Sequence, residues 1–209
     1  MTLDLNQKSK RNQGNLFVVS GPSGVGKGTL VFAAVKALPD VALSVSATTR
    51  APRPGEVDGV TYHFKSDAEF DELLGHGGLL EWAEVHGRRY GTLTSEVRTA
   101  LDEGRDLILE IDPQGCEQIQ RQLPEAFSIF IAPPSLAELR KRLEGRATED
   151  ADSIARRLET AEVEMRMQNR YNVVIVNDNQ ALATQELLAI LARRRGEQAY
   201  TATEPGNDS

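Results

Sequence analysis

The sequence contains little cysteine and no long apolar run. Its single cysteine, Cys116, excludes a disulfide within the chain. One unpaired thiol favours a reducing, cytoplasmic setting, and we expect this thiol to be buried and inert. The apolar stretches 16–19 and 173–176 fall far short of the roughly 20 residues that a bilayer requires. Residues 1–15 are polar and lack the apolar segment of a secretory signal, so we expect no membrane span and no membrane partner.

Basic residues are also in deficit. Lys and Arg number 24 against 31 Asp and Glu, and the formal net charge is -7. A protein that coats nucleic acid needs a net basic face to displace counterions, so we expect no nucleic-acid partner. A small phosphorylated ligand needs only a local cluster of cations, and net charge does not report where cations lie. The useful question is therefore the position of the basic residues.

Apolar strand patterns alternate with helical patterns through most of the chain. Strands that alternate with helices predict a parallel sheet covered on both faces, which is a three-layer α/β fold. The expected strands are 16–19, 41–46, 107–111, 127–131 and 173–176. The expected helices are 29–38, 95–103, 114–122, 136–143, 153–169 and 180–194.

One block, residues 47–94, interrupts this alternation with turn residues and short strand patterns. It contains a strand pattern at 62–64, a helix from Asp67 to about 74 with Asp67 as its cap, and a hairpin pattern at 79–85 and 88–92. We expect an inserted α+β subdomain here, within a domain that covers 16–195 and has its core at 16–46 and 95–195. The polar ends, 1–15 and 196–209, are expected to be disordered tails.

The segment Gly21–Lys27 reads GPSGVGK and matches the phosphate-loop pattern G-x-x-x-x-G-K. It follows an apolar strand and opens a helix, which is the context that such a loop requires. Glycines let the backbone wrap an anion, and the N–H groups at the helix start point toward it. Lys27 is expected to bridge the β- and γ-phosphates of a nucleotide. The alternative is a glycine-rich turn that binds nothing.

The loop departs from the common pattern at Gly28, where Ser or Thr usually binds Mg²⁺, and Thr29 follows one place later. We expect Mg²⁺ to be held mainly through phosphates and water, which this ion tolerates, with Thr29 as the candidate hydroxyl. Glu110 and Asp112 end an apolar strand pattern and are typical of acidic groups on the metal side of such a site. Taken alone, these two acids are equally compatible with a solvated turn.

A second basic group lies on a proline-rich segment. Arg50 and Arg53 are three residues apart, and their guanidinium groups suit bidentate binding of a phosphate. Tyr62 and Tyr90 are candidate hydroxyl donors to the same phosphate. Without further context, both arginines are also compatible with ordinary exposed charges on a loop.

Six stretches of the chain, which span almost all of residues 16–194, resemble the guanylate kinases of the nucleoside monophosphate kinase group. They are GPSGVGKGT (21–29), SATTRAPRPGEVDGVTYHF (46–64), LLEWAEVHGRRYGT (79–92), LILEIDPQG (107–115), FIAPPSLAELRKRLEGRATE (130–149) and VIVND (174–178). The second and third stretches are specific to this family, whereas the phosphate loop is not. The resemblance implies a P-loop kinase core, a GMP-binding insertion at 47–94 and a helical lid at about 144–157.

The resemblance implies an enzyme of purine nucleotide metabolism that transfers the γ-phosphoryl group of ATP to GMP, and to dGMP, giving ADP and GDP. Guanine presents two adjacent donors that suit a carboxylate, and adenine would leave that carboxylate unpaired. The acceptor is already a phosphate oxyanion, so positioning and charge neutralisation suffice without a strong general base.

The same resemblance assigns roles to individual residues. The implied ATP-binding residues are Gly21, Pro22, Ser23, Gly24, Val25, Gly26, Lys27, Gly28, Thr29, Asn177 and Asp178. The implied base-reading residues are Ser46, Glu81 and Thr92, and the implied phosphate-binding residues are Arg50, Arg53, Tyr62 and Tyr90. The residues placed near the ribose, the base or metal-bound water are Glu110 and Asp112. The implied catalytic residues are Lys27, Arg142, Arg146 and Arg157.

Two other interpretations remain open at this level. Guanylate kinase-like domains also serve as protein-binding modules in scaffold proteins, although such a module is expected to lose Lys27 or the lid arginines. A kinase that acts on AMP is compatible with the Lys27-Gly28-Thr29 pattern, whereas Glu81 and the tyrosine pair favour guanine. Whether the chain is a monomer or a homo-oligomer is not decided by the sequence.

Overall fold

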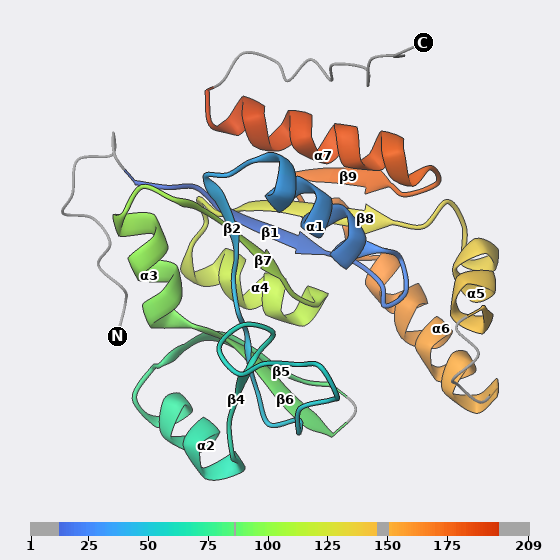
Figure 1. Cartoon of the computed structure of the whole chain (residues 1–209). Helices are drawn as coiled ribbons and strands as arrows, with labels where there is room; N and C mark the ends of the chain where they lie inside the picture. Colours follow the sequence, from blue (N-terminus) through green and yellow to red (C-terminus); the bar gives the residue numbers. More distant parts are fainter. Residues whose placement is uncertain (1–12, 86, 146–150, 197–209) are drawn as a thin grey trace.

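The computed structural model describes residues 13–85, 87–145 and 151–196, which form two β-sheets and the helices around them (Figure 1). The larger sheet has five strands in the order β2-β7-β1-β8-β9, and every neighbouring pair is parallel. These strands are β1 (Leu16–Ser20), β2 (Val41–Leu43), β7 (Asp106–Glu110), β8 (Phe127–Ala132) and β9 (Val173–Val176). The parallel α/β sheet predicted from the sequence is confirmed.

Helices cover both faces of this sheet, because successive residues of its buried strands point into two different hydrophobic clusters. Phe17 and Val19 of β1 pack in one cluster with α1 and α7, whereas Leu16 and Val18 pack in the other with α3 and α4. The helices are α1 (Lys27–Ala37), α3 (Thr94–Asp102), α4 (Pro113–Gln122), α5 (Leu136–Glu144), α6 (Ala151–Met165) and α7 (Gln180–Arg194). None of the helices in the described ranges is long and apolar enough to cross a membrane.

The second sheet is built from the block that interrupts the alternation and lies below the core sheet in Figure 1. Its four strands have the order β4-β3-β6-β5, and β5 pairs with β6 as the antiparallel hairpin that the sequence predicts. The elements are β3 (Ala47–Thr48), β4 (His63–Phe64), α2 (Asp67–Gly75), β5 (Leu79–Val85) and β6 (Arg88–Leu93). We call this unit the insertion sheet.

Three local predictions were wrong. The strand expected at 41–46 ends at Leu43, because Val45 donates its N–H to Glu96 Oε1 and the chain then crosses to the insertion sheet. Asp67 does not cap α2; Ser66 does, in a reciprocal capping box with Glu69. The helix expected at 153–169 begins at Ala151 and ends at Met165, and a 3₁₀ turn follows at Gln168–Arg170.

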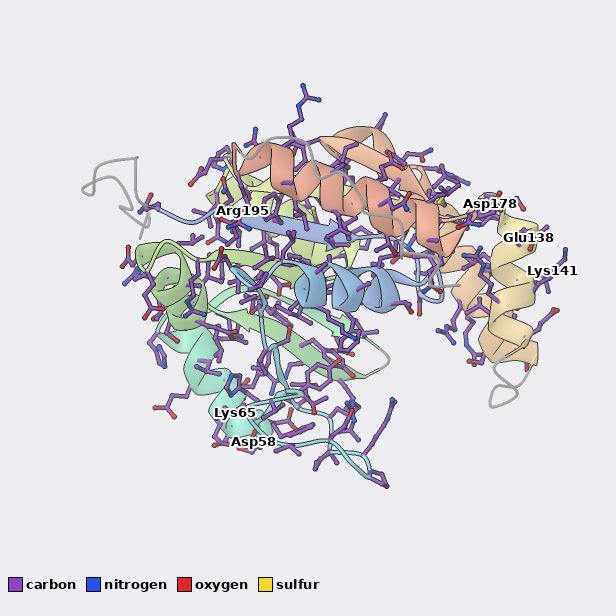
Figure 2. The ribbon with its side chains drawn as sticks, turned by 45° about the horizontal axis from the view of Figure 1, so that its top comes forward. Asp58, Lys65, Glu138, Lys141, Asp178 and Arg195 are labelled. Carbon is purple, nitrogen blue, oxygen red and sulfur yellow. The ribbon has the colours of Figure 1, made fainter. Side chains whose placement is uncertain are left out.

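A buried ion pair ties the ends of the core together on the side away from the glycine loop. Asp106 is 5% exposed and accepts hydrogen bonds from Asn15 through the backbone N–H at 2.6 Å and the side-chain amide at 2.9 Å. Arg195, which follows α7, lies 3.1 Å from the same carboxylate and 3.0 Å from Asp40. Figure 2 shows Arg195 at the opposite end of the core from Asp178.

The substitution Asp106→Ala should lower the free energy of unfolding by about 3 kcal/mol, because it leaves a largely buried guanidinium without this carboxylate. Urea denaturation followed by circular dichroism measures the change. The matched control is Glu103→Ala, whose carboxylate pairs with Arg105 where both side chains are about half exposed. This control should cost less than about 1 kcal/mol, and equal losses in both variants would contradict a special role for the buried pair.

Candidate functional site

The glycine loop joins the central strand β1 to α1, and its backbone requires glycine at positions 24 and 26 among others. Gly24 and Gly26 have φ values of 87° and 98°, in the left-handed region that side chains disfavour. A Cβ on Gly24 would lie 2.6 Å from Leu143, and one on Gly26 would lie 2.7 Å from Asn177 Nδ2. Within the described chain, the first turn of α1 has neither an acidic residue nor a side-chain cap. Its N–H groups therefore suit a bound anion.

Lys27 folds back over its own loop. Its Nζ donates to the carbonyl oxygens of Gly21 and Pro22, the second at 3.1 Å. Burial lowers the pKa of Lys27, while the nearby carboxylates of Glu110, Glu164 and Asp112 act in the opposite direction. The lysine thus stands between the loop and a set of acidic groups, which is where a cation can neutralise a phosphate.

Glu164 is a member of this group that sequence reasoning missed. It lies on α6 seven residues after Arg157, so the two side chains are on the same side of the helix, beside the buried face that carries Ile154, Leu158 and Ala161. Burial raises the pKa of Glu164 to about 7, although Lys27 opposes the shift. The available signal was the helical spacing, which places Glu164 two turns after Arg157 on the same side of the helix.

Side chains from three other elements hold the glycine loop in place. Arg142 of α5 donates to the carbonyl oxygens of Val25 at 3.3 Å and Asn177 at 2.8 Å. Asn177, at the end of β9, donates through Nδ2 to the same Val25 oxygen at 2.8 Å. Arg157 of α6 donates to Ser23 Oγ at 2.6 Å. Asn177, predicted for the ATP side, and Arg142 and Arg157, predicted as catalytic, therefore meet around the loop.

A cavity of about 340 Å³ opens beside the loop at the end of the core that carries α5. Figure 2 shows Asp178 at this end, next to Glu138 and Lys141 of α5. The cavity-lining residues are Gly24, Val25, Gly26, Arg142, Asn177, Asp178 and Gln180. All but Gln180 were expected from the sequence.

The proline-rich segment holds Arg50 in a fixed position. Arg50 forms two hydrogen bonds with Glu56, at 2.7 and 2.9 Å, and its guanidinium carbon lies 5.2 Å from the centre of the Tyr62 ring. The rings of Tyr62 and Tyr90 are 6.0 Å apart at their centres. Arg53 is exposed, and its backbone N–H donates to Glu56.

Glu56 was not predicted from the sequence, and it is the partner that orients Arg50. The hydrogen bonds from Arg50 lower the pKa of Glu56 to about 2. A conspicuous acid at the end of the segment, in the string RPGE, was the available signal. An arginine held by a carboxylate is pre-organised for a second anionic partner.

A buried carboxylate lies between the insertion sheet and the core. Glu81 is 4% exposed, and its Oε1 accepts a hydrogen bond of 2.6 Å from the Thr92 hydroxyl on the neighbouring strand. Burial raises the pKa of Glu81 to about 7, and the nearby Asp112 also raises it. A carboxylate that carries this desolvation cost has capacity to accept further hydrogen bonds from a ligand.

The acidic end of β7 faces the glycine loop. The Glu110 carboxylate lies 3.5 Å from the position that a Cβ on Gly28 would occupy, and Asp112 caps α4 by accepting from the Gly115 N–H at 2.8 Å. Thr29 is exposed. No group of three or more His, Cys, Asp or Glu residues that could hold a metal occurs among the described residues. The protein atoms described here therefore do not form a closed metal cage.

Two of the predicted site residues have fewer described contacts. Ser46 is partly buried in the crossing between β2 and β3, where its carbonyl oxygen accepts from the His63 N–H at 2.9 Å. Arg146 and the adjoining part of the predicted lid lie outside the described residues. Cys116, in contrast, is buried as expected, and burial raises the pKa of its thiol to about 11.

Comparison with known proteins adds a family to this geometry. A family model described as guanylate kinase matches residues 13–194. The guanylate kinase of Rubrobacter xylanophilus is 49% identical over 181 residues, which cover 87% of this chain and 95% of that protein. That of Thermobifida fusca is 50% identical over 177 residues, covering 85% and 90%. The crystal structure of guanylate kinase from Anaplasma phagocytophilum has a TM-score of 0.73 at 31% identity and covers 90% of this chain and 89% of that chain.

A central parallel strand, a glycine loop with its lysine and an acidic strand end opposite define a nucleotide kinase of the P-loop class. The chain belongs to the guanylate kinase family. It is an enzyme that transfers the γ-phosphoryl group of ATP to GMP, as predicted from the sequence. The interpretations as a scaffold module and as an AMP kinase are not supported.

Proposed function

We propose that Glu81, Thr92 and Ser46 read the guanine of GMP. The observation that carries this proposal is the buried Glu81 carboxylate, which is held by the Thr92 hydroxyl at 2.6 Å. Guanine N1–H and N2–H₂ are two adjacent donors that would share this acceptor, and adenine cannot supply both. A site built to accept these donors discriminates strongly against a base that lacks them.

The phosphate of GMP is assigned to Arg50, Arg53, Tyr62 and Tyr90. Arg50 is already oriented by Glu56 and by the Tyr62 ring, so little side-chain entropy is lost when a phosphate binds. Glu56 stays paired with Arg50 and limits the positive charge of the segment. The remaining hydrogen-bond capacity of the guanidinium and the two phenols then selects a dianionic phosphate over a neutral group.

The triphosphate of ATP is assigned to residues 21–29, with its adenine side toward Asn177 and Asp178. The uncapped start of α1 provides N–H groups for the phosphates, and Lys27 exchanges its bonds to the loop carbonyls for bonds to phosphate oxygens. The cavity lined by Asp178 lies next to this loop, which supports the placement of the base there.

Arg142, Arg146 and Arg157 are assigned to the transferring phosphoryl group. In this structure Arg142 donates to Val25 and Asn177, and Arg157 donates to Ser23. Both guanidinium groups are therefore already at the phosphate loop, and lid closure would exchange these neutral acceptors for phosphate oxygens. Closure also excludes water, which suppresses hydrolysis of ATP.

The residues at this site fit Mg²⁺ bound through phosphates and water. Glu110 lies against Gly28, where a hydroxyl would otherwise stand, so its carboxylate is placed to accept from metal-bound water. The ion would supply charge neutralisation on the β- and γ-phosphates. We also propose that dGMP is an acceptor and that the protein is cytoplasmic, the second supported by its single, buried thiol.

Production of ADP with GMP, dGMP, AMP, CMP and UMP, compared side by side, tests the proposed base reading. We expect turnover with GMP and dGMP and a loss of at least about 10³-fold in kcat/KM with AMP. Equal use of GMP and AMP would overturn the assignment of Glu81 as the base reader without affecting the assignment of the phosphate loop.

The affinity for GMP should fall as pH drops below about 7. Only the ionised Glu81 carboxylate accepts both guanine donors, and its pKa in the free enzyme is raised by burial to about 7. Calorimetric titration with GMP, in the absence of ATP, measures Kd at pH 6 and at pH 8. After the pH dependence of Glu81→Gln is subtracted as the baseline, binding by the parent enzyme should be roughly tenfold weaker at pH 6 than at pH 8. Glu164→Gln should keep the full pH dependence, and loss of the dependence in that variant would contradict this assignment.

The ionisation of Glu81 makes folding stability depend on pH in the opposite direction to GMP binding. Because the folded pKa of Glu81 lies above its ordinary value of 4.5, the folded protein retains a proton that the unfolded chain releases between those pH values. The contribution of this group to stability is therefore present at low pH and is lost as pH rises toward about 7.

A further inference from the structure

The edge of the insertion sheet is held by two glutamines of α4, which we call the glutamine clasp (Gln118 and Gln122). Strand β5 has β6 as its partner on one side, and α4 lies along its other edge. Gln118 donates to the Trp82 carbonyl oxygen at 2.7 Å and accepts from the Trp82 N–H at 3.2 Å. Gln122 donates to the Leu80 carbonyl oxygen at 2.7 Å. The clasp thus supplies the hydrogen bonds that another strand would make.

The clasp holds the backbone on both sides of Glu81, because Leu80 and Trp82 are its direct neighbours in sequence. The Glu81 side chain itself turns inward, where it is 4% exposed and bonded to Thr92 of β6. Its backbone position is therefore set by α4 of the core and its carboxylate by the insertion sheet. A shift of α4 relative to β5 would move this carboxylate.

Gly115 lies on the same face of α4 as the clasp, three and seven residues before Gln118 and Gln122. A Cβ on Gly115 would lie 2.4 Å from Glu81 Oε2, a contact that no relaxed side chain makes. The missing side chain at this position therefore leaves the room that the carboxylate occupies. The first turn of α4, which contains Gly115, is fixed by Asp112, whose side chain caps the helix.

We propose that Gln118, Gln122 and Gly115 are positioning residues for guanine recognition. They act through Glu81 and do not touch the nucleotide, so the inference rests on the proposed role of Glu81. Gly115 sets how closely the Glu81 carboxylate approaches the core, and the clasp sets the position of the Glu81 backbone. Misplacement of a recognising group by about 1 Å costs on the order of 10²-fold in efficiency.

The double variant Gln118→Ala/Gln122→Ala tests the clasp against a matched control on the same helix. Gln120→Ala also removes side-chain hydrogen bonds, to Ser128 and to the carbonyl of Arg170, but it leaves β5 untouched. We expect the double variant to raise KM for GMP by about tenfold or more and to lower the preference for GMP over AMP, with KM for ATP changed less than about twofold. Gln120→Ala should change thermal stability without changing either KM.

Two single variants keep the proposal testable if the double variant does not fold. Gln118→Glu retains the acceptor for the Trp82 N–H and loses the donor to the Trp82 carbonyl, so it should raise KM for GMP by an intermediate factor. Gly115→Ala should raise KM for GMP more than KM for ATP, because its methyl group displaces the Glu81 carboxylate. Equal effects on both substrates, or none on GMP, in these two variants would overturn the proposal.

The test separates failure of the clasp from failure of the base reader. If Glu81→Gln abolishes the preference for GMP over AMP and the clasp variants keep it, only the positioning proposal is wrong. If Glu81→Gln itself keeps the preference, the role assigned to Glu81 is wrong and the positioning proposal is overturned with it.

Discussion

Lys27→Ala is expected to reduce kcat by about 10²- to 10³-fold while leaving the affinity for GMP nearly unchanged. The Lys27 ammonium is the charge that reaches across the glycine loop, and among the described residues its hydrogen-bond partners are the carbonyl oxygens of Gly21 and Pro22. No other lysine occurs in the described part of α1 near the loop, since Lys36 lies in the last turn. Single-turnover kinetics with ATP and GMP, together with calorimetric GMP binding, measure the two effects separately.

Three comparisons sharpen this result. Lys27→Met keeps most of the side-chain length and should be as slow as Lys27→Ala, because the charge is what is lost. Lys36→Ala changes an exposed lysine of the same helix and should turn over normally. Turnover of Lys27→Ala within about threefold of the parent enzyme would refute the assignment of residues 21–29 as the triphosphate site.

Glu81→Gln is expected to lower kcat/KM for GMP by about 10²-fold or more. The amide keeps one acceptor but presents an N–H₂ donor to a guanine edge that itself consists of donors, so one ligand donor is left unpaired. Folding should not suffer, because burial raises the pKa of Glu81 to about 7 and ionisation at neutral pH is therefore costly in the free enzyme. Steady-state kinetics and thermal denaturation at pH 8 measure the two quantities.

The control for this variant is Thr92→Val, which removes the hydroxyl that donates to Glu81 Oε1 and keeps the carboxylate. It should weaken GMP use less than Glu81→Gln does, because the acceptor for guanine remains. A larger effect of Thr92→Val than of Glu81→Gln would assign the main base contact to the hydroxyl instead.

The glycine loop could be predicted from sequence because its chemistry is local. The glycines, Lys27 and the start of α1 are consecutive, and the conformation of the loop follows from glycine at 24 and 26. Glu164 and Gln180 could not be placed in the same way. Each is one polar residue on a helix, and only the packing of α6 and α7 against the core brings it to the loop or to its cavity.

The GMP side was predicted through motifs whose residues are far apart in the chain. The hairpin of β5 and β6 follows from the two strand patterns at 79–85 and 88–92, and it explains why Glu81 and Thr92 are cross-strand partners. The hairpin does not predict which residues bind Arg50 or the free edge of β5. Glu56 and the glutamine clasp are ordinary polar residues in sequence, and they acquire roles from the three-dimensional path of the chain.

The sequence by itself determined the α/β class, the phosphate loop and the family, because these depend on short-range patterns of glycine, charge and apolar periodicity. Only the tertiary structure decided where the strand at 41–43 leaves the core, which helix face meets the insertion sheet, and which acids surround Lys27. The physical reason is that burial and hydrogen bonding between distant segments depend on how elements pack, and no local pattern encodes them. The pKa values of Glu81 and Glu164, both raised to about 7 by burial, are properties of that packing alone.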